Sequence, residues 1–141
     1  MCLDIIKDIK ITEPYGYKVF RKTNNKIRFL YQNDNNITNK IPFNKWIDEK
    51  HFRQDDVEQN RGLLEVFYIS QSNERFYRKG FHLYKNKSDA IDIKNIQFFQ
   101  YPNFNDNTCV VYKVKFKEVV ATGFQGGRET IVARKIKILK E

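Results

Sequence analysis

Two stretches in the last third of the chain decide the fold: CVVYKVKFK at Cys109–Lys117 and TIVARKIKIL at Thr130–Leu139. Both alternate between apolar and charged residues with a period of two, which is typical of a strand that buries one face. The apolar residues expected on the buried face are Val110, Tyr112, Val114, Phe116, Ile136 and Ile138. The lysines on the opposite face are Lys113, Lys115, Lys117, Lys135 and Lys137. We therefore predict a sheet with one apolar face and one lysine-coated face.

Shorter patterns upstream predict further strands and little helix. Tyr17–Lys22 and Ile27–Tyr31 flank a pair of asparagines and indicate a hairpin. Phe81–Tyr84 has the composition of a strand. Ser88 is a suitable N-cap, and Asp89 behind it favours the helix dipole, so we expect a short helix to begin there.

The segments between these elements are less defined. Residues 2–11 fit either a strand or a short helix, and the Asn-rich residues 32–44 indicate a solvated loop. Lys45–Phe52 is interpreted as a helical turn anchored by Trp46, and Gly62–Ser70 as a strand, with a helix as the alternative.

These elements together predict one α+β domain spanning residues 1–141, built mainly on an antiparallel sheet with one or two short helices. A chain of 141 residues has the commonest size of a single domain, and its 15% aromatic content supplies apolar area for a core. The core that we predict consists of Phe20, Trp46, Phe67, Phe81, Val110, Tyr112, Val114, Phe116, Ile136 and Ile138.

The net charge of +9 is distributed unevenly along the chain. Residues 76–141 contain 13 basic and 6 acidic residues, whereas residues 44–75 contain 5 basic and 7 acidic ones. A basic surface attracts nucleic acid, nucleotides or acidic proteins and membranes. An AT-rich coding sequence, which favours lysine and asparagine codons, is the alternative explanation of this composition.

The five lysines of the predicted face are expected to lie within a Debye length of one another. Such a group of ammonium ions must be solvated or matched by an anion. Because Tyr112 and Phe116 point to the opposite face, we expect contacts to phosphate rather than stacking on bases. Anion binding and an ordinary solvated face are both open readings of these lysines.

Two arginines near the lysines are further candidates for anion binding. Alternation places Arg134 on the side of Val132 and Ile136, where it needs a carboxylate, such as Glu118, or a bound anion. A bulge that turns Arg134 outward is the alternative. Arg128 follows the glycines of GFQGGRET at residues 123–130, a segment whose amides could hold a phosphate but which fits a hairpin connection better.

The histidines and cysteines give little indication of a catalytic or metal site. His82, in GFHLY, is a candidate acid or base, with a structural histidine as the alternative. Cys2 could serve as a terminal nucleophile if Met1 is removed, but no other feature indicates a hydrolase. No spacing links these residues to His51 or Cys109 as metal ligands. We therefore expect no metal, no cofactor and free thiols.

The sequence contains neither a recognisable secretory signal nor an apolar run of membrane-spanning length. A protein of a reducing cytoplasm that does not bind membranes is therefore expected, while the oligomeric state is left open.

Several motifs resemble a loose set of small proteins encoded by bacteriophages and large DNA viruses. These motifs are the MCL start, YGYKVFRK, KGFHLYKNKSDAI, VVYKVKFKEVVATG and ETIVARKIKIL, which together cover most of the chain outside residues 32–75. The resemblance implies a viral setting, in the cytoplasm of a host cell, and no particular mechanism.

The chain also resembles the ADP-ribosyltransferase-like fold, in which a split sheet holds NAD. The resemblance implies that Arg21 in YKVFRK, Tyr84 in GFHLY and Glu129 in RETIV take the catalytic places. The candidate catalytic residues are therefore Arg21, His82 and Glu129.

Three functions follow as hypotheses. The first is a non-enzymatic viral accessory protein that binds nucleic acid, a nucleotide or an acidic host protein through its basic C-terminal half. The second is an NAD-using enzyme of the ADP-ribosyltransferase type, and the third is a virion or assembly component.

Overall fold

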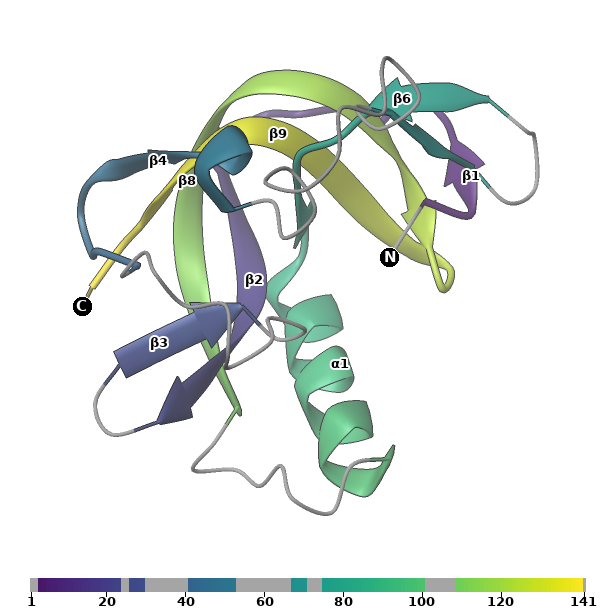
Figure 1. Ribbon diagram of the computed structural model, residues 1–141. Coiled ribbons are helices and arrows are strands. Elements are labelled where there is room, and N and C mark those ends of the chain that lie inside the picture. The colour runs from purple at the N-terminus through teal and green to yellow at the C-terminus, as the bar shows by residue number, and fades with distance from the viewer. Residues whose placement is uncertain are drawn as a thin grey trace, which may run out of the picture.

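The structure of the protein, a computed structural model, describes residues 3–23, 26–29, 41–52, 67–70, 75–100 and 109–140, with the backbone alone at 23, 51–52, 67–69 and 97–100. Antiparallel strands dominate, accompanied by one α-helix (Figure 1), which confirms the predicted α+β class. The elements are β1 (Ile5–Ile6), β2 (Tyr15–Thr23), β3 (Lys26–Phe29), β4 (Trp46–Asp48), the 3₁₀ helix η2 (Glu49–Phe52), β5 (Phe67–Ile69), β6 (Phe76–Arg78), β7 (Phe81–Tyr84), α1 (Lys87–Gln100), β8 (Cys109–Gln125) and β9 (Arg128–Ile138).

The main sheet curls until it closes on itself. β8 pairs with β2, β2 with β7, β7 with β9, and β9 pairs with β8 again. The β2–β7 link is narrow, with Tyr17 opposite Tyr84, whereas β8 and β9 remain paired from Val114 to Gln125. β1 and β4 extend the sheet beyond β8 and β9, and β3 pairs with β2. The result is a small barrel, and β5 and β6 form a separate two-stranded ribbon.

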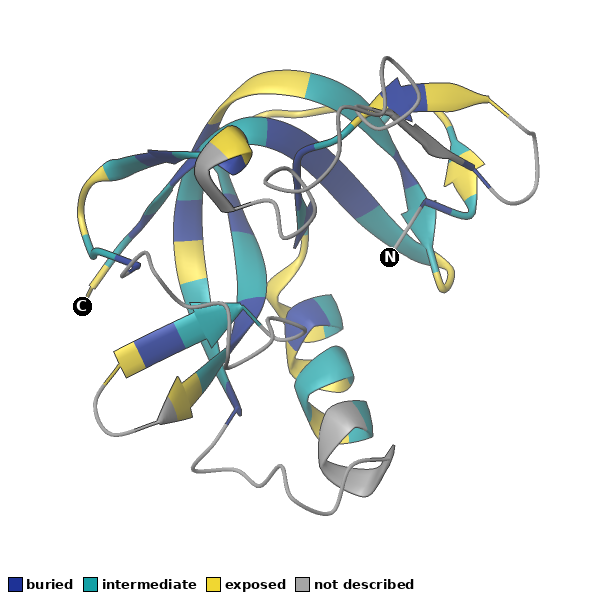
Figure 2. Cartoon of the chain, in the orientation of Figure 1, coloured by how far each residue is buried: buried dark blue, intermediate teal, exposed yellow. Residues whose placement is uncertain are grey.

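The main core fills the interior of this barrel. Phe20 of β2, Leu83 of β7, Val114 of β8 and Ile136 of β9 are fully buried and belong to one cluster. Figure 2 shows buried residues recurring along β8 and β9 between more exposed ones. The predicted core residues confirmed in this cluster are Phe20, Phe81, Val114, Phe116, Ile136 and Ile138, while Val110 and Tyr112 pack against it.

The predicted core included two residues that the structure does not place in this cluster. Trp46 is half-buried, and its ring contacts lysines instead. Its segment, Lys45–Phe52, is not a single helical turn, because β4 precedes η2 there. Trp46 therefore lies on an extended strand, where alternation with the buried Ile47 turns it outward. The side chain of Phe67 lies outside the described residues.

The hairpin connection predicted around the glycines is confirmed, but it is shorter than expected. Gly126 and Gly127 have φ angles of 58° and 75°, the left-handed conformation that a two-residue type I′ turn requires at both positions. Phe124 and Glu129 pair with each other across the hairpin, so they belong to the strands. The carboxylate of Asp4 accepts a hydrogen bond from the amide of Gly126 at 2.6 Å and holds the turn against the N-terminal segment.

Both long strands bend at the same level, and the bend changes which side chains face inward. Ala133 and Ile136 both lie in the main core although three positions separate them, so the alternation changes phase between them. In β8, at the level of this phase change, Glu118 has a φ of 58°. The pairing register of β8 with β9 shifts between Val119 and Ala121, as in a β-bulge. Arg134 lies at this irregularity and is half-buried. The phase change departs from the strict alternation on which its expected inward position is based and fits the alternative of a bulge.

The helix is longer than predicted and covers the outside of the barrel. α1 contains 14 residues and begins at Lys87. The amides of Asp89 and Ala90 donate hydrogen bonds to the carbonyl of Asn86. Asn86 therefore precedes the helix as its N-cap, and Ser88, the predicted N-cap, lies inside the first turn. Ala90 packs with Val19 of β2 and Cys109 of β8, so the helix shields the outer face of these two strands at one end.

The remaining sequence predictions have mixed outcomes. The β2–β3 hairpin is confirmed, β1 decides for a strand within residues 2–11, and β5 is consistent with the predicted strand at residues 62–70. Most of the predicted loop at residues 32–44, and residues 62–66, lie outside the described residues.

The turn predicts a selective response to substitution. Gly126→Val should lower the free energy of unfolding by about 1–2 kcal/mol, because a β-branched residue resists the left-handed conformation. Gly126→Asn should cost much less, because asparagine tolerates that conformation. Urea denaturation of the two variants measures the difference, and equal losses would contradict this description of the turn.

Candidate anion-binding face

Alternation and strand register bring the lysines together on the outer face of the barrel. Lys115 lies opposite Lys137 and Lys117 opposite Lys135 in the β8–β9 pairing, while Lys113 lies two residues before Lys115 on the same face. Residues directly opposite on one face have Cβ atoms about 5 Å apart. All five predicted lysines therefore form one group, and their half-buried or exposed side chains leave it open to solvent.

Two aromatic residues from other strands complete this face. Tyr15 of β2 lies opposite Lys115, and Trp46 of β4 lies opposite Lys137. The residues in register across four strands are, in order, Tyr15, Lys115, Lys137 and Trp46. With about 4.8 Å between neighbouring strands, the backbones that carry the two rings lie about 14 Å apart along the sheet. We call the five lysines together with Tyr15 and Trp46 the lysine platform.

The ammonium groups contact the aromatic rings. The Nζ atoms of Lys117 and Lys137 lie 4.1 Å and 5.1 Å from the centroid of the Trp46 ring. The Nζ atom of Lys113 lies 4.5 Å from the centroid of the Tyr15 ring. These distances fall within the range of cation–π attraction, about 6 Å. The rings therefore gather the positive charges. Tyr112 and Phe116 face away from the lysines as expected, but Tyr15 and Trp46 join this face from neighbouring strands.

Among the described residues, this face carries fewer acidic than basic groups: Asp48 of β4 lies opposite Lys135 in the β4–β9 pairing, and Glu118 follows Lys117 in β8. Glu118 pairs with Lys135 at 3.0 Å, rather than with Arg134 as the sequence suggested. Among the described residues, this is the one ion pair that any of the five lysines makes. Like charges directly opposite each other on a sheet are destabilising. The platform therefore holds its lysines together at a cost in stability that a bound anion can offset.

Arg128 and Arg134, the other two predicted anion-binding residues, lie outside the platform. Arg128 is in the β8–β9 turn region, opposite Gln125, and its guanidinium donates to the carbonyl of Gly126 at 3.0 Å. Arg134 precedes Lys135 at the bend of β9. The structure thus gathers the five lysines but not the two arginines.

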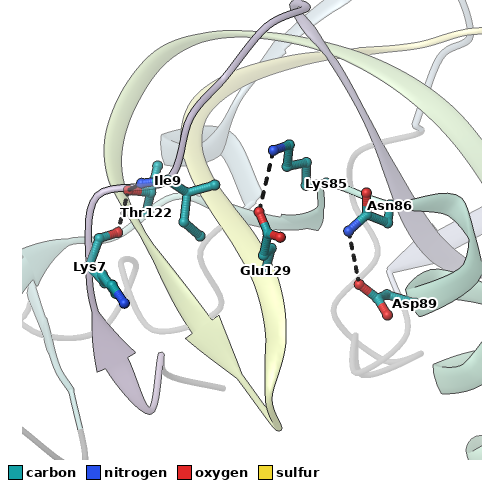
Figure 3. Close-up of polar contacts among 7 residues, drawn as sticks. All are labelled: Lys7, Ile9, Lys85, Asn86, Asp89, Thr122 and Glu129. Atoms are coloured by element: carbon teal, nitrogen blue, oxygen red, sulfur yellow. Dashed lines mark hydrogen bonds and ion pairs between the residues drawn. The ribbon is translucent and has the colours of Figure 1, made fainter.

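The candidate catalytic residues do not form a common site. Arg21 lies opposite Cys109, four residues along β2 from Tyr17, the residue that pairs with Tyr84. That separation is about 13 Å along the strand. Glu129 forms an ion pair with Lys85 at 3.4 Å near the start of α1 (Figure 3). Arg21 therefore lies apart from Tyr84. Tyr84 and Glu129 lie close together, because Tyr84 pairs with Thr130, the neighbour of Glu129, whereas His82 lies further along β7, opposite Val132.

His82 is held in a hydrogen-bonded chain. The hydroxyl of the buried Tyr77 accepts a hydrogen bond from the amide of Leu3 at 2.7 Å and lies 3.1 Å from Nε2 of His82. Which of the two groups donates in this contact depends on the tautomer of His82, and a neutral imidazole can take either role. Burial, with the nearby charge of Lys18, lowers the pKa of His82 to about 3.

Lys18 is a charged residue that the sequence analysis did not select. Its Nζ donates to the carbonyl of His82 at 2.7 Å and lies 5.7 Å from the centroid of the Phe29 ring. Burial lowers the pKa of Lys18 to about 8. The sequence did contain a signal for it, because Lys18 lies two residues before Phe20 and therefore on the same face of β2 as this fully buried residue.

The described residues include no cluster of three histidine, cysteine, aspartate or glutamate side chains arranged as metal ligands. Cys109 is a buried free thiol. Within the same residues, no helix has the length and apolar character needed to cross a membrane.

The chain matches no known protein family, no curated protein and no solved structure. Function is therefore inferred from the surface of the molecule itself.

The environment of His82 predicts a loss of stability in acid. Its pKa of about 3 in the folded protein lies below its usual value of 6.5, so the unfolded chain binds the proton first as the pH falls. The stability contribution of neutral His82 is therefore complete above pH 6.5 and is lost towards pH 3, with a slope of up to about 1.4 kcal/mol per pH unit. Urea denaturation between pH 7 and pH 4 measures this slope.

The comparison of two variants isolates the effect of this histidine. His82→Gln should flatten the slope between pH 6.5 and pH 5, whereas His51→Gln, at the other histidine of the chain, should not. An unchanged slope in His82→Gln would show that other groups cause the acid sensitivity.

Proposed function

We propose that the protein binds single-stranded nucleic acid on the lysine platform, without sequence preference and without catalysis. The observation that carries the proposal is the row of Tyr15, Lys115, Lys137 and Trp46 across four strands. Surfaces that bind single strands combine cations, which meet the phosphates, with aromatic rings, on which the bases stack. Both kinds of group occur here within one patch.

The dimensions of the platform favour a single strand. The strands that carry Tyr15 and Trp46 are about 14 Å apart along the sheet, with lysines between them. A single strand that crosses this face can place a base against each ring and phosphates at the lysines between them. A duplex presents phosphates but no unstacked bases, so it could use the lysines and not the rings. The platform therefore has features that a duplex does not require.

The composition of the surface favours nucleic acid over an acidic protein. A carboxylate-rich partner would be matched by the lysines alone, and rings already in contact with ammonium groups would add little to its binding. If the lysines were only solvated, the like-charge pairs Lys115–Lys137 and Lys117–Lys135 would lower the stability of the fold without any gain in binding. The resemblance to small phage and viral proteins leads us to propose a viral accessory protein as the setting.

The single tryptophan of the chain provides a direct test of stacking. Trp46 is the only tryptophan, so its fluorescence reports on the platform alone. Addition of an oligothymidylate of 12 nucleotides, roughly enough to cover the face, should quench this fluorescence. Polyglutamate of matched charge should not quench it, and neither should a hairpin duplex. Quenching by polyglutamate but not by the oligonucleotide would instead identify an acidic protein surface as the partner.

The salt dependence of the same titration counts the phosphate contacts. With three to five lysines engaged, the slope of log K against log salt concentration should be about −2 to −4. Trp46→Ala should weaken binding by about 5- to 100-fold, and Trp46→Phe by much less, because a stacked base contributes about 1–3 kcal/mol. A slope near zero, or no binding at low salt, would overturn the proposed function.

Charge removal should separate binding from stability. Lys137→Gln should weaken oligonucleotide binding and reduce the magnitude of the salt slope by about 0.7. It should change the free energy of unfolding by less than about 0.5 kcal/mol, because the removal of a like-charge pair and the loss of the cation–π contact with Trp46 oppose each other. Lys26→Gln, at an exposed position of β3, is the matched control and should change neither quantity. Equal effects of the two variants on binding would argue for a nonspecific basic surface.

A further inference from the structure

A groove of about 490 Å³ adjoins the platform at Tyr15. It lies between the extended segment that leads into β2 and the junction of β7 with α1, near the Lys85 and Asn86 side chains of Figure 3. Its volume falls within the range of small-molecule pockets, about 300–1,000 Å³. Tyr15 belongs both to the groove and to the platform, so a chain that crosses the platform reaches the groove at this ring.

The two sides of the groove differ in chemistry. Tyr15 and Tyr17 of β2 and the buried Ile131 of β9 provide aromatic and apolar contacts. Lys87 and Ser88, the first residues of α1, provide a cation and a hydroxyl donor. A nucleotide has the same division, with a base that stacks and a phosphate that requires donors and positive charge.

The acidic residues near the groove restrict where a phosphate can lie. The Glu129 carboxylate is held by Lys85 at 3.4 Å, and the Asp89 carboxylate lies 3.4 Å from the side-chain amide of Asn86 (Figure 3). Glu13 comes from the segment opposite the helix. The phosphate is therefore favoured at Lys87 and Ser88, on the helix side, and disfavoured beside Glu13.

We propose that this groove binds the terminal nucleotide of the strand that occupies the platform, with its base against Tyr15 and Tyr17 and its terminal phosphate at Lys87 and Ser88. The proposal rests on the proposed function, because the platform delivers the strand. It adds a preference for strand ends, since a terminal phosphate carries up to two negative charges and three free oxygens, and so gains more from the cation of Lys87 and the hydroxyl of Ser88 than an internal phosphodiester does. The protein thus binds the end of a phosphorylated single strand more tightly than its interior.

A comparison of linear with circular DNA tests the preference for ends. Linear and circular oligothymidylates of equal length are titrated against the wild-type protein, the linear one with a terminal phosphate at either end or without one. We expect a phosphorylated linear strand to bind about tenfold more tightly than the circle, a difference that one charged hydrogen bond can supply. Trp46 fluorescence should be quenched by both, because both reach the platform.

Variants separate the groove from the platform. Lys87→Gln should abolish the advantage of the phosphorylated end and leave circle binding unchanged. Lys94→Gln, further along the same helix and not among the groove residues, should retain the advantage. Trp46→Ala should weaken the binding of linear and circular strands alike.

The outcomes distinguish failure of the groove from failure of the platform. Equal affinity for linear and circular strands, with Trp46 quenched by both, would overturn the groove proposal and leave the proposed function intact. Loss of the end preference in Lys94→Gln as well as in Lys87→Gln would also overturn it, because the effect would then be one of general helix charge. Absence of binding to either DNA would overturn both.

Discussion

The double pairing of β8 is the constraint on which the rest of the structure depends. Its first half pairs with β2 and its second half with β9, while β7 links β2 to β9. Because β7 also links β2 to β9, the sheet closes on itself, and closure requires the 17-residue β8 to bend. Glu118, with its positive φ, and the register shift beside it provide that bend, and the phase change in β9 matches it from the other side. The ring can then close around Phe20, Leu83 and Ile136.

The same pairing builds the outer face. Because β8 lies between β2 and β9, its lysines stand between a tyrosine of β2 and the lysines of β9, with Trp46 of β4 beyond. The helix covers the other end of this face through contacts around Val19 and Cys109, which leaves the lysine end open. One strand thus determines both the apolar interior and the charged exterior. The groove at Tyr15 lies beside this exterior, at the junction of β7 with α1.

The barrel core stabilises the fold, whereas repulsion among the lysines of the platform lowers its stability. The barrel core is an apolar cluster, whereas the platform places Lys115 against Lys137 and Lys117 against Lys135, with the carboxylates of Glu118 in β8 and Asp48 in the neighbouring β4. Contacts with Trp46 and Tyr15 offset part of the repulsion, each by about 0.5–1 kcal/mol. The aromatic rings therefore stabilise the gathered lysines in the free protein. Under the proposed function they also provide stacking surfaces for the bases of a single strand.

The amino-acid sequence by itself determined the period-two faces of β8 and β9, because alternation is a local property of an extended chain. It also determined the α+β class, the turn at the glycines and the five lysines that share a face. It did not reveal that Tyr15 and Trp46 join those lysines, because that depends on which strands become neighbours. Nor did it decide whether β9 alternates strictly or has a bulge at Arg134. Only the tertiary structure decided these features, since closure of the barrel requires departures from ideal strand geometry and sets the register between distant segments.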